Sequence, residues 1–357
     1  MRAVLLGGGI GLLISLLGTR VAIKQFTRLG YGQPIRDDGP TTHHTKRGTP
    51  TMGGGVIILA SVVGYFAAKL ITWTVPSASA LLLVFLFVGL GFIGFLDDYI
   101  KVTSQNNQGL RGKAKLAGQG VVGLAFGILS LSPWLEDDRG RTPASEKVSF
   151  LREIEWLSLP MVLAVVLVLL IVTGTSNAVN LADGLDGLAT GACVMVFGAY
   201  TLVNIWQNNQ FCQDDPGPLC YNVRDPLDLA VIAAAITGAC FGFLWWNASP
   251  AAIFMGDTGS LGLGGAIAAL AILSRTELLL VLIGGLFLIV TGSVIVQRAY
   301  FKITKGKRIF LMSPLHHHFE LKGWAEITVV VRFWLIAGLF VAAGIGLFYL
   351  EWSNRRG

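Results

Sequence analysis

Two adjacent carboxylates end an apolar run in this sequence. The run begins near Ala80 and stops at Asp97 and Asp98, which are followed by Tyr99-Ile100-Lys101. If the run is a helix, these acids lie at its C-terminus, where the helix dipole disfavours negative charge. Neighbouring helical positions also project about 100° apart rather than onto one face. We therefore expect a partner outside this helix, with a solvated acidic loop beside Lys101 as the simpler alternative.

Further acids lie in two segments that contain no Lys or Arg. Asn180, Asp183 and Asp186 belong to the segment Asn-Leu-Ala-Asp-Gly-Leu-Asp-Gly. Their oxygens suit Mg²⁺ or a hydrogen-bonding sugar or base. Helix capping is the alternative, although it does not require both aspartates. Asp257 is the only acid in the stretch 245–260 and is predicted either to cap the next helix or to bind a metal ion.

Cations, histidines and an aromatic residue supply complementary chemistry. Lys46 stands among glycines and hydroxyl residues, a setting that suits phosphate oxygens as well as membrane anchoring. Lys115 belongs to a basic loop after the acid pair, which would hold a phosphate head group or simply orient the chain. The run His316-His317-His318 favours diphosphate binding over zinc, because consecutive histidines do not readily ligate one ion. Phe254 is either a membrane anchor or a stacking platform for a planar ring.

Composition places these motifs in a membrane protein. The 357 residues are 53% hydrophobic and 13% charged, whereas soluble domains carry about 25% charged residues. At about 20 apolar residues per span, we predict ten transmembrane helices in a single domain, 1–357, of all-α class. The predicted cores are 3–23, 53–72, 78–96, 115–133, 159–178, 187–206, 227–246, 259–274, 278–298 and 327–350. The first is taken as an uncleaved span, because no cleavage pattern follows it.

Lysine and arginine are concentrated in the loops after the odd-numbered spans. The positive-inside rule therefore places those loops in the cytoplasm and both termini outside. The segments that hold the candidate site residues all fall on the predicted cytoplasmic side. They are 43–55, 97–98, 180–187, 247–260 and 315–320. We infer a single site at the cytoplasmic membrane surface. Nucleic-acid binding is disfavoured, because the cations lie in short loops rather than along one face.

The opposite side carries fewer signals. Cys212 and Cys220 share one loop there, and an oxidising compartment would permit a disulfide between them. The long loop from Trp134 to Ser158, with charges of both signs, has no assigned role.

Together, the motifs resemble the polyprenyl-phosphate N-acetylhexosamine-1-phosphate transferases, and among them the phospho-N-acetylmuramoyl-pentapeptide transferase branch. The resemblance covers nearly the whole chain. It rests on the segments 48–54, 97–99, 180–187, 254–260 and 316–320. It implies ten membrane helices in the bacterial plasma membrane and transfer of phospho-MurNAc-pentapeptide from UDP-MurNAc-pentapeptide to polyprenyl phosphate. The products are lipid I and UMP, and Mg²⁺ is the implied cofactor. It also implies a homodimer, for which no residue gives independent support.

The resemblance carries residue roles with it. Asp97, Asp98 and Asp257 match the family's essential acids, Asp257 matches its Mg²⁺ ligand, and His316 matches a catalytically important histidine. Positions that match the nucleotide and phosphate pocket are Lys46, Lys115, Asn180, Asp183, Asp186, Asn247, Phe254 and His317, with Phe254 expected to stack on uracil. Two reaction courses stay open. In one, Asp97 or Asp98 orients or deprotonates the attacking lipid phosphate, and in the other an Asp forms a phospho-sugar enzyme.

Two rival functions fit parts of the pattern. A sister enzyme that uses UDP-GlcNAc would have the same acids but a different histidine pattern. A cation-coupled transporter would use intramembrane acids, yet the acids here lie at predicted loop edges, and no half-chain repeat is visible. A purely structural membrane protein would not explain the acids, lysines and histidines in these five loops.

Overall fold

A computed structural model describes residues 1–32, 46, 48–104, 109–212, 217 and 220–354. Helices make up nearly all of its regular structure, which confirms the all-α prediction. They are α1 (Arg2–Leu29), α2 (Gly54–Ile71), α3 (Ala78–Thr103), α4 (Gly112–Ser130), α5 (Met161–Ala182), α6 (Leu188–Asn209), α7 (Pro226–Asn247), α8 (Gly256–Leu273), α9 (Leu280–Ile283), α10 (Gly285–Ile303), α11 (Leu315–Leu321) and α12 (Glu326–Asn354). A short 3-10 helix, η2 (Pro133–Leu135), and an antiparallel hairpin of β1 (Lys147–Ser149) and β2 (Glu153–Ser158) complete the described elements.

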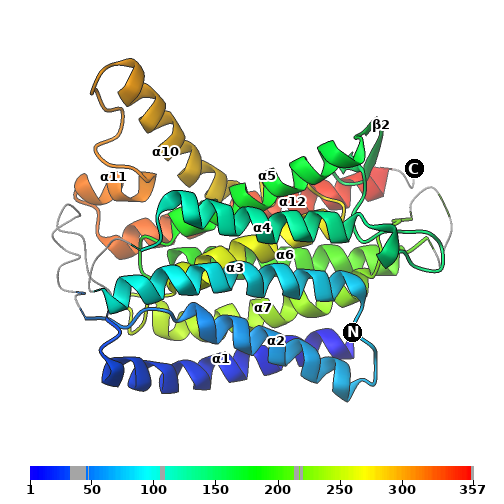
Figure 1. Ribbon diagram of the computed structural model, residues 1–357, viewed down its shortest axis with the longest axis horizontal. Helices are drawn as coiled ribbons and strands as arrows, with labels where there is room; N and C mark the ends of the chain where they lie inside the picture. Colours follow the sequence, from blue (N-terminus) through cyan, green and yellow to red (C-terminus); the bar gives the residue numbers. More distant parts are fainter. Residues whose placement is uncertain (33–45, 47, 105–108, 213–216, 218–219, 355–357) are drawn as a thin grey trace.

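The helices form a polytopic membrane bundle. Nine described helices are long and apolar enough to cross a membrane: α1, α2, α3, α5, α6, α7, α8, α10 and α12. The predicted span at 115–133 corresponds to α4, which is not among these nine helices. It packs against α3 and α5, and Lys113 and Lys115 lie in its first turns. The predicted span at 278–298 is interrupted, because α9 ends at Ile283 and α10 starts at Gly285. From this break, α10 tilts away from the bundle, and the chain then returns to α11 at one end of the bundle (Figure 1).

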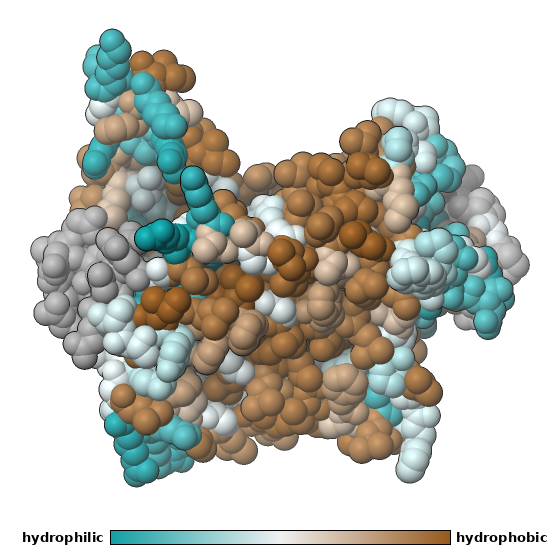
Figure 2. Space-filling view, viewed as in Figure 1, coloured by the Kyte–Doolittle hydropathy of each residue, from teal (hydrophilic) through white to brown (hydrophobic). Residues whose placement is uncertain are grey.

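The surface of the bundle matches a bilayer. A hydrophobic band crosses the middle of the molecule, and hydrophilic residues gather at both ends (Figure 2). The start of α1 and the C-terminal part of α12 lie on the side of the bundle opposite α11 (Figure 1). The interior is built around α8, which is 89% buried and packs against α3 and α5. The start of α8 lies against the segment that precedes α2, through backbone hydrogen bonds at Phe254 and Met255.

Glycine sets the distance between α3 and α8. A Cβ atom on Gly94 of α3 would lie 2.0 Å from the backbone oxygen of Asp257, closer than non-bonded atoms approach. Gly256 begins α8 with a φ of 74°, and a Cβ there would lie 2.6 Å from Asp98 Oδ2. Because only glycine adopts this conformation without strain, the chain holds the α3 acids next to Asp257 through backbone contact.

The loop from Trp134 to Ser158 stabilises the end of the bundle opposite α11. The guanidinium of Arg152, between the two hairpin strands, lies 4.0 Å from the ring centre of Tyr221 and 2.9 Å from Glu351 Oε1. Tyr221 in turn stacks on Phe348 of α12, with ring centres 5.3 Å apart. Cys212 and Cys220 form a disulfide, which confirms the hypothesis from the sequence. This end therefore joins the hairpin, the disulfide loop and α12.

Replacement of both Cys212 and Cys220 by serine is expected to lower the free energy of unfolding by roughly 2–3 kcal/mol, because the bond closes a short loop in the unfolded chain. Thermal unfolding in detergent, with and without reductant, measures the effect. The serine variant serves as the control and should not respond to reductant. Cys193 and Cys240 are buried, so thiol labelling of the native protein reports on the loop pair. Labelling of both loop thiols without reductant would contradict the disulfide.

Candidate active site

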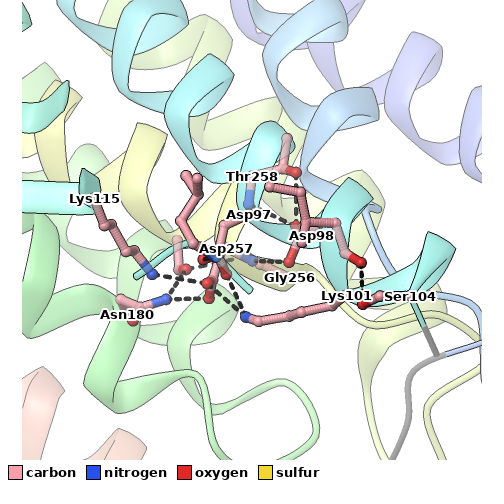
Figure 3. Close-up of polar contacts among 12 residues, drawn as sticks. Asp97, Asp98, Lys101, Ser104, Lys115, Asn180, Gly256, Asp257 and Thr258 are labelled. Carbon is pink, nitrogen blue, oxygen red and sulfur yellow. Dashed lines mark hydrogen bonds and ion pairs between the residues drawn. The ribbon is translucent and has the colours of Figure 1, made fainter. Parts of the chain in front are cut away.

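Three acids that the sequence singled out meet at one end of the bundle. Asp97 and Asp98 lie in the last turns of α3, and Asp257 lies in the first turn of α8. One carboxylate oxygen from each residue lies within 4.8 Å of the other two (Figure 3). The two α3 acids are buried. The predicted partner outside the α3 helix is therefore the N-terminus of α8.

Asp98 holds that N-terminus. Its Oδ1 accepts a hydrogen bond from the backbone N–H of Asp257 at 3.0 Å. Its Oδ2 accepts from the backbone N–H of Thr258 at 2.9 Å and from the Thr258 hydroxyl at 2.7 Å. Free N–H groups and the positive end of the helix dipole favour a carboxylate at this position. Asp98 thus caps a helix other than its own, and both of its oxygens are engaged.

Asp257 and Asp97 are surrounded by cations and an amide. Asp257 Oδ2 lies 2.8 Å from Lys101 Nζ and 2.7 Å from Lys115 Nζ, and Asn180 Nδ2 donates to Asp257 Oδ1 at 2.6 Å (Figure 3). Lys101 also pairs with Asp97 Oδ2 at 2.5 Å, one helical turn away. Three carboxylates and two ammonium groups leave one formal negative charge in this cluster. Lys101 was not among the predicted site residues, although its i,i+4 spacing from Asp97 could have indicated the pair.

The donor set of the acid cluster fits a magnesium ion. Mg²⁺ prefers oxygen ligands at 2.0–2.1 Å, so opposite ligands lie about 4 Å apart. One oxygen from each of Asp97, Asp98 and Asp257 lies within 4.8 Å of the others, so the side chains would draw closer together to hold one ion. Asp98 is held by backbone N–H groups of α8, whereas Asp257 is contacted by lysine and asparagine side chains that can move aside, so Asp257, with Asp97 beside it, is the better ligand. Histidine and cysteine are absent from this group of ligating atoms among the described residues.

A second charged cluster connects three distant segments. Lys46 Nζ lies 2.7 Å from Asp186 Oδ1 and 2.6 Å from Glu326 Oε1. Glu326 Oε1 also accepts from the backbone N–H of Asp186 at 3.0 Å. The sequence predicted Lys46 and Asp186 as site residues but missed Glu326, which no spacing rule links to either of them. Lys46 thus lies between carboxylates here.

The loop between α5 and α6 lies between the two clusters. Burial raises the pKa of the Asp183 carboxyl well above its usual range, and the charges of Asp257, Asp98 and Asp186 raise it further. A Cβ atom on Gly184, the next residue, would lie 2.4 Å from His316 Nε2. The loop therefore faces the acid cluster on one side and the histidine run on the other.

The predicted histidines lie on α11. His316 is fully buried, and its ring centre is 4.3 Å from that of His317. His317 Nδ1 lies 2.6 Å from Glu320 Oε2, one turn along the helix. Their contact with the loop between α5 and α6 brings α11 to the same end of the bundle as the acids.

Two predicted substrate-binding residues are held in structural contacts. Asn247 is buried, accepts from the Thr190 hydroxyl at 2.7 Å and donates to the Ile253 carbonyl at 2.9 Å. Phe254 is half-buried, and its backbone N–H donates to the Pro50 carbonyl at 2.8 Å. These contacts hold the loop before α8 against the segment before α2. The Asn247 side chain and the Phe254 backbone therefore position the loop that leads to Asp257 in α8.

A cavity of about 970 Å³ lies at the opposite end of the bundle, near the start of α1. Its charged residues largely neutralise one another, with Lys69 paired to Asp228 and Arg141 paired to Asp137, both at 2.7 Å. The predicted catalytic residues do not line it. Volume alone therefore does not identify the site in this fold.

Comparison with known proteins agrees with this arrangement. The profile of glycosyl transferase family 4 matches residues 80–275, which include the acid cluster. A phospho-N-acetylmuramoyl-pentapeptide-transferase from Nocardioides sp. (strain ATCC BAA-499 / JS614) is 69% identical, with 99% of each chain covered. Proteins of the same name from Cutibacterium acnes and Streptomyces avermitilis are 60% and 56% identical, with 99% and 100% of each chain covered. The chain therefore belongs to the phospho-N-acetylmuramoyl-pentapeptide-transferase family, within glycosyl transferase family 4.

Proposed function

We propose that the protein transfers phospho-MurNAc-pentapeptide from UDP-MurNAc-pentapeptide to polyprenyl phosphate and releases UMP. The observation that carries this proposal is the meeting of Asp97 and Asp257 with Lys101 and Lys115 at one end of a membrane bundle. Phosphoryl transfer depends mainly on positioning and on neutralisation of phosphate charge. Carboxylates that bind a metal ion and lysines that bind phosphates would position the substrates and neutralise their charge.

Mg²⁺ is the cofactor that we propose for this site, with Asp257 as its principal ligand and Asp97 beside it. A bound Mg²⁺ would neutralise charge on the diphosphate of the nucleotide. Lys101 and Lys115 lie close enough to Asp257 to contact the same phosphate oxygens. Asn180 fixes the orientation of the Asp257 carboxylate through its amide.

Of the two α3 acids, we propose Asp97 as the group that orients or deprotonates the lipid phosphate. Both oxygens of Asp98 hold the start of α8, which makes Asp98 a positioning residue. Asp97 is held by the Leu110 backbone N–H at 2.8 Å and by Lys101, two contacts that a substrate phosphate can rearrange. This role fits either a single or a double displacement.

The remaining predicted residues form the proposed nucleotide and sugar pocket. Asp183 and Asp186 on the loop between α5 and α6 supply hydrogen-bonding oxygens, and His317 faces that loop. His316, which lies against Gly184 of the same loop, is proposed as the catalytic histidine. Lys46 is proposed to contact a phosphate, and Phe254 to stack on uracil.

We also propose that the site faces the cytoplasm of a bacterial cell. The positive-inside rule supports this orientation. Both chain ends, which the same rule predicts to lie outside, are at the end of the bundle away from α11 (Figure 1). The polyprenyl carrier and the homodimer come from the family resemblance and stay predictions.

Release of UMP by the purified protein tests the reaction. In detergent, with UDP-MurNAc-pentapeptide, polyprenyl phosphate and Mg²⁺, we expect UMP to form and to stop forming when EDTA is added. UDP-GlcNAc is assayed in parallel. Release with UDP-GlcNAc alone would assign the sister activity, and no release with either nucleotide from folded protein would contradict the transferase and favour a transporter.

A further inference from the structure

Glu326 lies at the point where three distant segments of the site meet. It belongs to the first turn of α12, and its carboxylate is only partly exposed, at 18%. Oε1 accepts from Lys46 Nζ at 2.6 Å and from the backbone N–H of Asp186 at 3.0 Å. A single oxygen atom therefore connects α12 to the segment before α2 and to the loop between α5 and α6.

The simplest explanation of Glu326 is a favourable interaction with the dipole of its own helix. An acid anywhere in the first turn of a helix is stabilised in this way, with its side chain in solvent. The Glu326 carboxylate instead engages Lys46 and Asp186, which are 280 and 140 residues away from it in the chain. The dipole does not account for these two contacts.

The contacts of Asp186 extend this connection toward the acid cluster. Asp186 Oδ2 accepts from the backbone N–H of Ala251 at 3.0 Å, and Ala251 belongs to the loop that leads into α8. A continuous path of hydrogen bonds thus runs from Glu326 through Asp186 to the segment that carries Asp257. Asp186 itself is almost fully buried.

The same arrangement directs Lys46. An ammonium group has three N–H donors, and two of them are used by Asp186 and Glu326 in the described part of the chain. Two fixed acceptors determine the direction of the third donor. Removal of one acceptor would let the flexible lysine side chain rotate, so Glu326 restricts Lys46 before any ligand binds.

We propose that Glu326 is a positioning residue of the transfer reaction, which holds Lys46 and the loop between α5 and α6 in the geometry that binds the nucleotide substrate. This inference rests on the proposed function. Glu326 does not contact the reacting atoms and acts through Lys46 and Asp186.

Substitution of Glu326 tests the proposal through kinetics. Glu326→Ala is expected to lower kcat/KM for UDP-MurNAc-pentapeptide by roughly ten- to a hundredfold, as for other residues that orient a ligand-binding group. Glu326→Gln keeps an acceptor for the Asp186 N–H and should recover part of the loss. In a Lys46→Met background, Glu326→Ala should add little, because the two residues act through one contact. The matched control is Glu155→Ala, an acid of the distant hairpin that is 79% exposed.

A second measurement does not depend on the reaction. The rate at which an amine reagent labels Lys46, followed by mass spectrometry and normalised to exposed Lys322, should rise roughly three- to fivefold in Glu326→Ala. Unchanged labelling would overturn the proposal even if the wild-type protein released no UMP. With an active wild type, an unchanged kcat/KM, or losses that simply multiply in the double variant, would overturn it while leaving the transferase activity intact.

Discussion

Asp257→Asn is expected to reduce kcat for UMP release by roughly a thousandfold, the scale seen when a preorganised electrostatic group is removed from an active site. The substitution keeps the shape of the side chain and removes its charge. Lys101 and Lys115, both within 2.8 Å of Asp257 Oδ2, would then lack their common counter-ion. The proposed Mg²⁺ would also lose its principal ligand.

UMP release measured over a range of Mg²⁺ concentrations checks this result, with thermal unfolding as the test of folding. Asp138→Asn, at an exposed acid of the opposite end, is the matched control and should retain full activity. Asp98→Asn offers an informative contrast. Because Asp98 caps α8, we expect the Asp98→Asn substitution to lower the unfolding temperature more than Asp257→Asn does. Near-normal turnover by folded Asp257→Asn protein would exclude Asp257 from catalysis.

Gly94→Ala is expected to impair the enzyme without changing any polar group. The new Cβ atom would lie 2.0 Å from the backbone oxygen of Asp257, so α3 and α8 must move apart. Such overpacking typically costs about 1–3 kcal/mol, more than alanine gains over glycine from helix propensity. A displacement of about 1 Å between catalytic groups lowers the rate by about a hundredfold.

The measurements for Gly94→Ala are thermal unfolding and UMP release, compared with Gly198→Ala in α6. A Cβ atom on Gly198 would meet nothing within 4 Å, so this control should keep its activity and gain up to about 1 kcal/mol from helix propensity. If the two variants behave alike, the close approach of α3 and α8 does not control the site.

Local patterns predicted the parts of this structure that depend on neighbouring residues. The apolar runs correspond to helices, because a membrane span needs about 20 apolar residues whatever its partners are. Asp97 and Asp98 were expected at the end of their helix, and α3 instead continues to Thr103, but the expected partner from another element is present at the start of α8. The interruption at Gly284 was not predicted, since apolar residues continue on both sides of it.

Roles that depend on distant contacts were beyond these patterns. The sequence offered Asp97 and Asp98 as equivalents, and only the start of α8 distinguishes the helix cap from its neighbour. Lys46 was predicted as a phosphate ligand without its two carboxylate partners, which are 140 and 280 residues away. Spacing rules describe the surface of one helix, and these pairs form only when the bundle assembles.

The burial of α8 has a consequence for how the protein is made. This helix carries Asp257, contains five glycines and is shielded from lipid by its neighbours over most of its length. Its glycines and Asp257 reduce the free energy that α8 gains by entering the bilayer alone, and its packing partners α3 and α5 are synthesised before it. We therefore expect α8 to integrate by docking onto helices already in the membrane. Membrane insertion of this helix and assembly of the acid cluster would then be a single event during biogenesis.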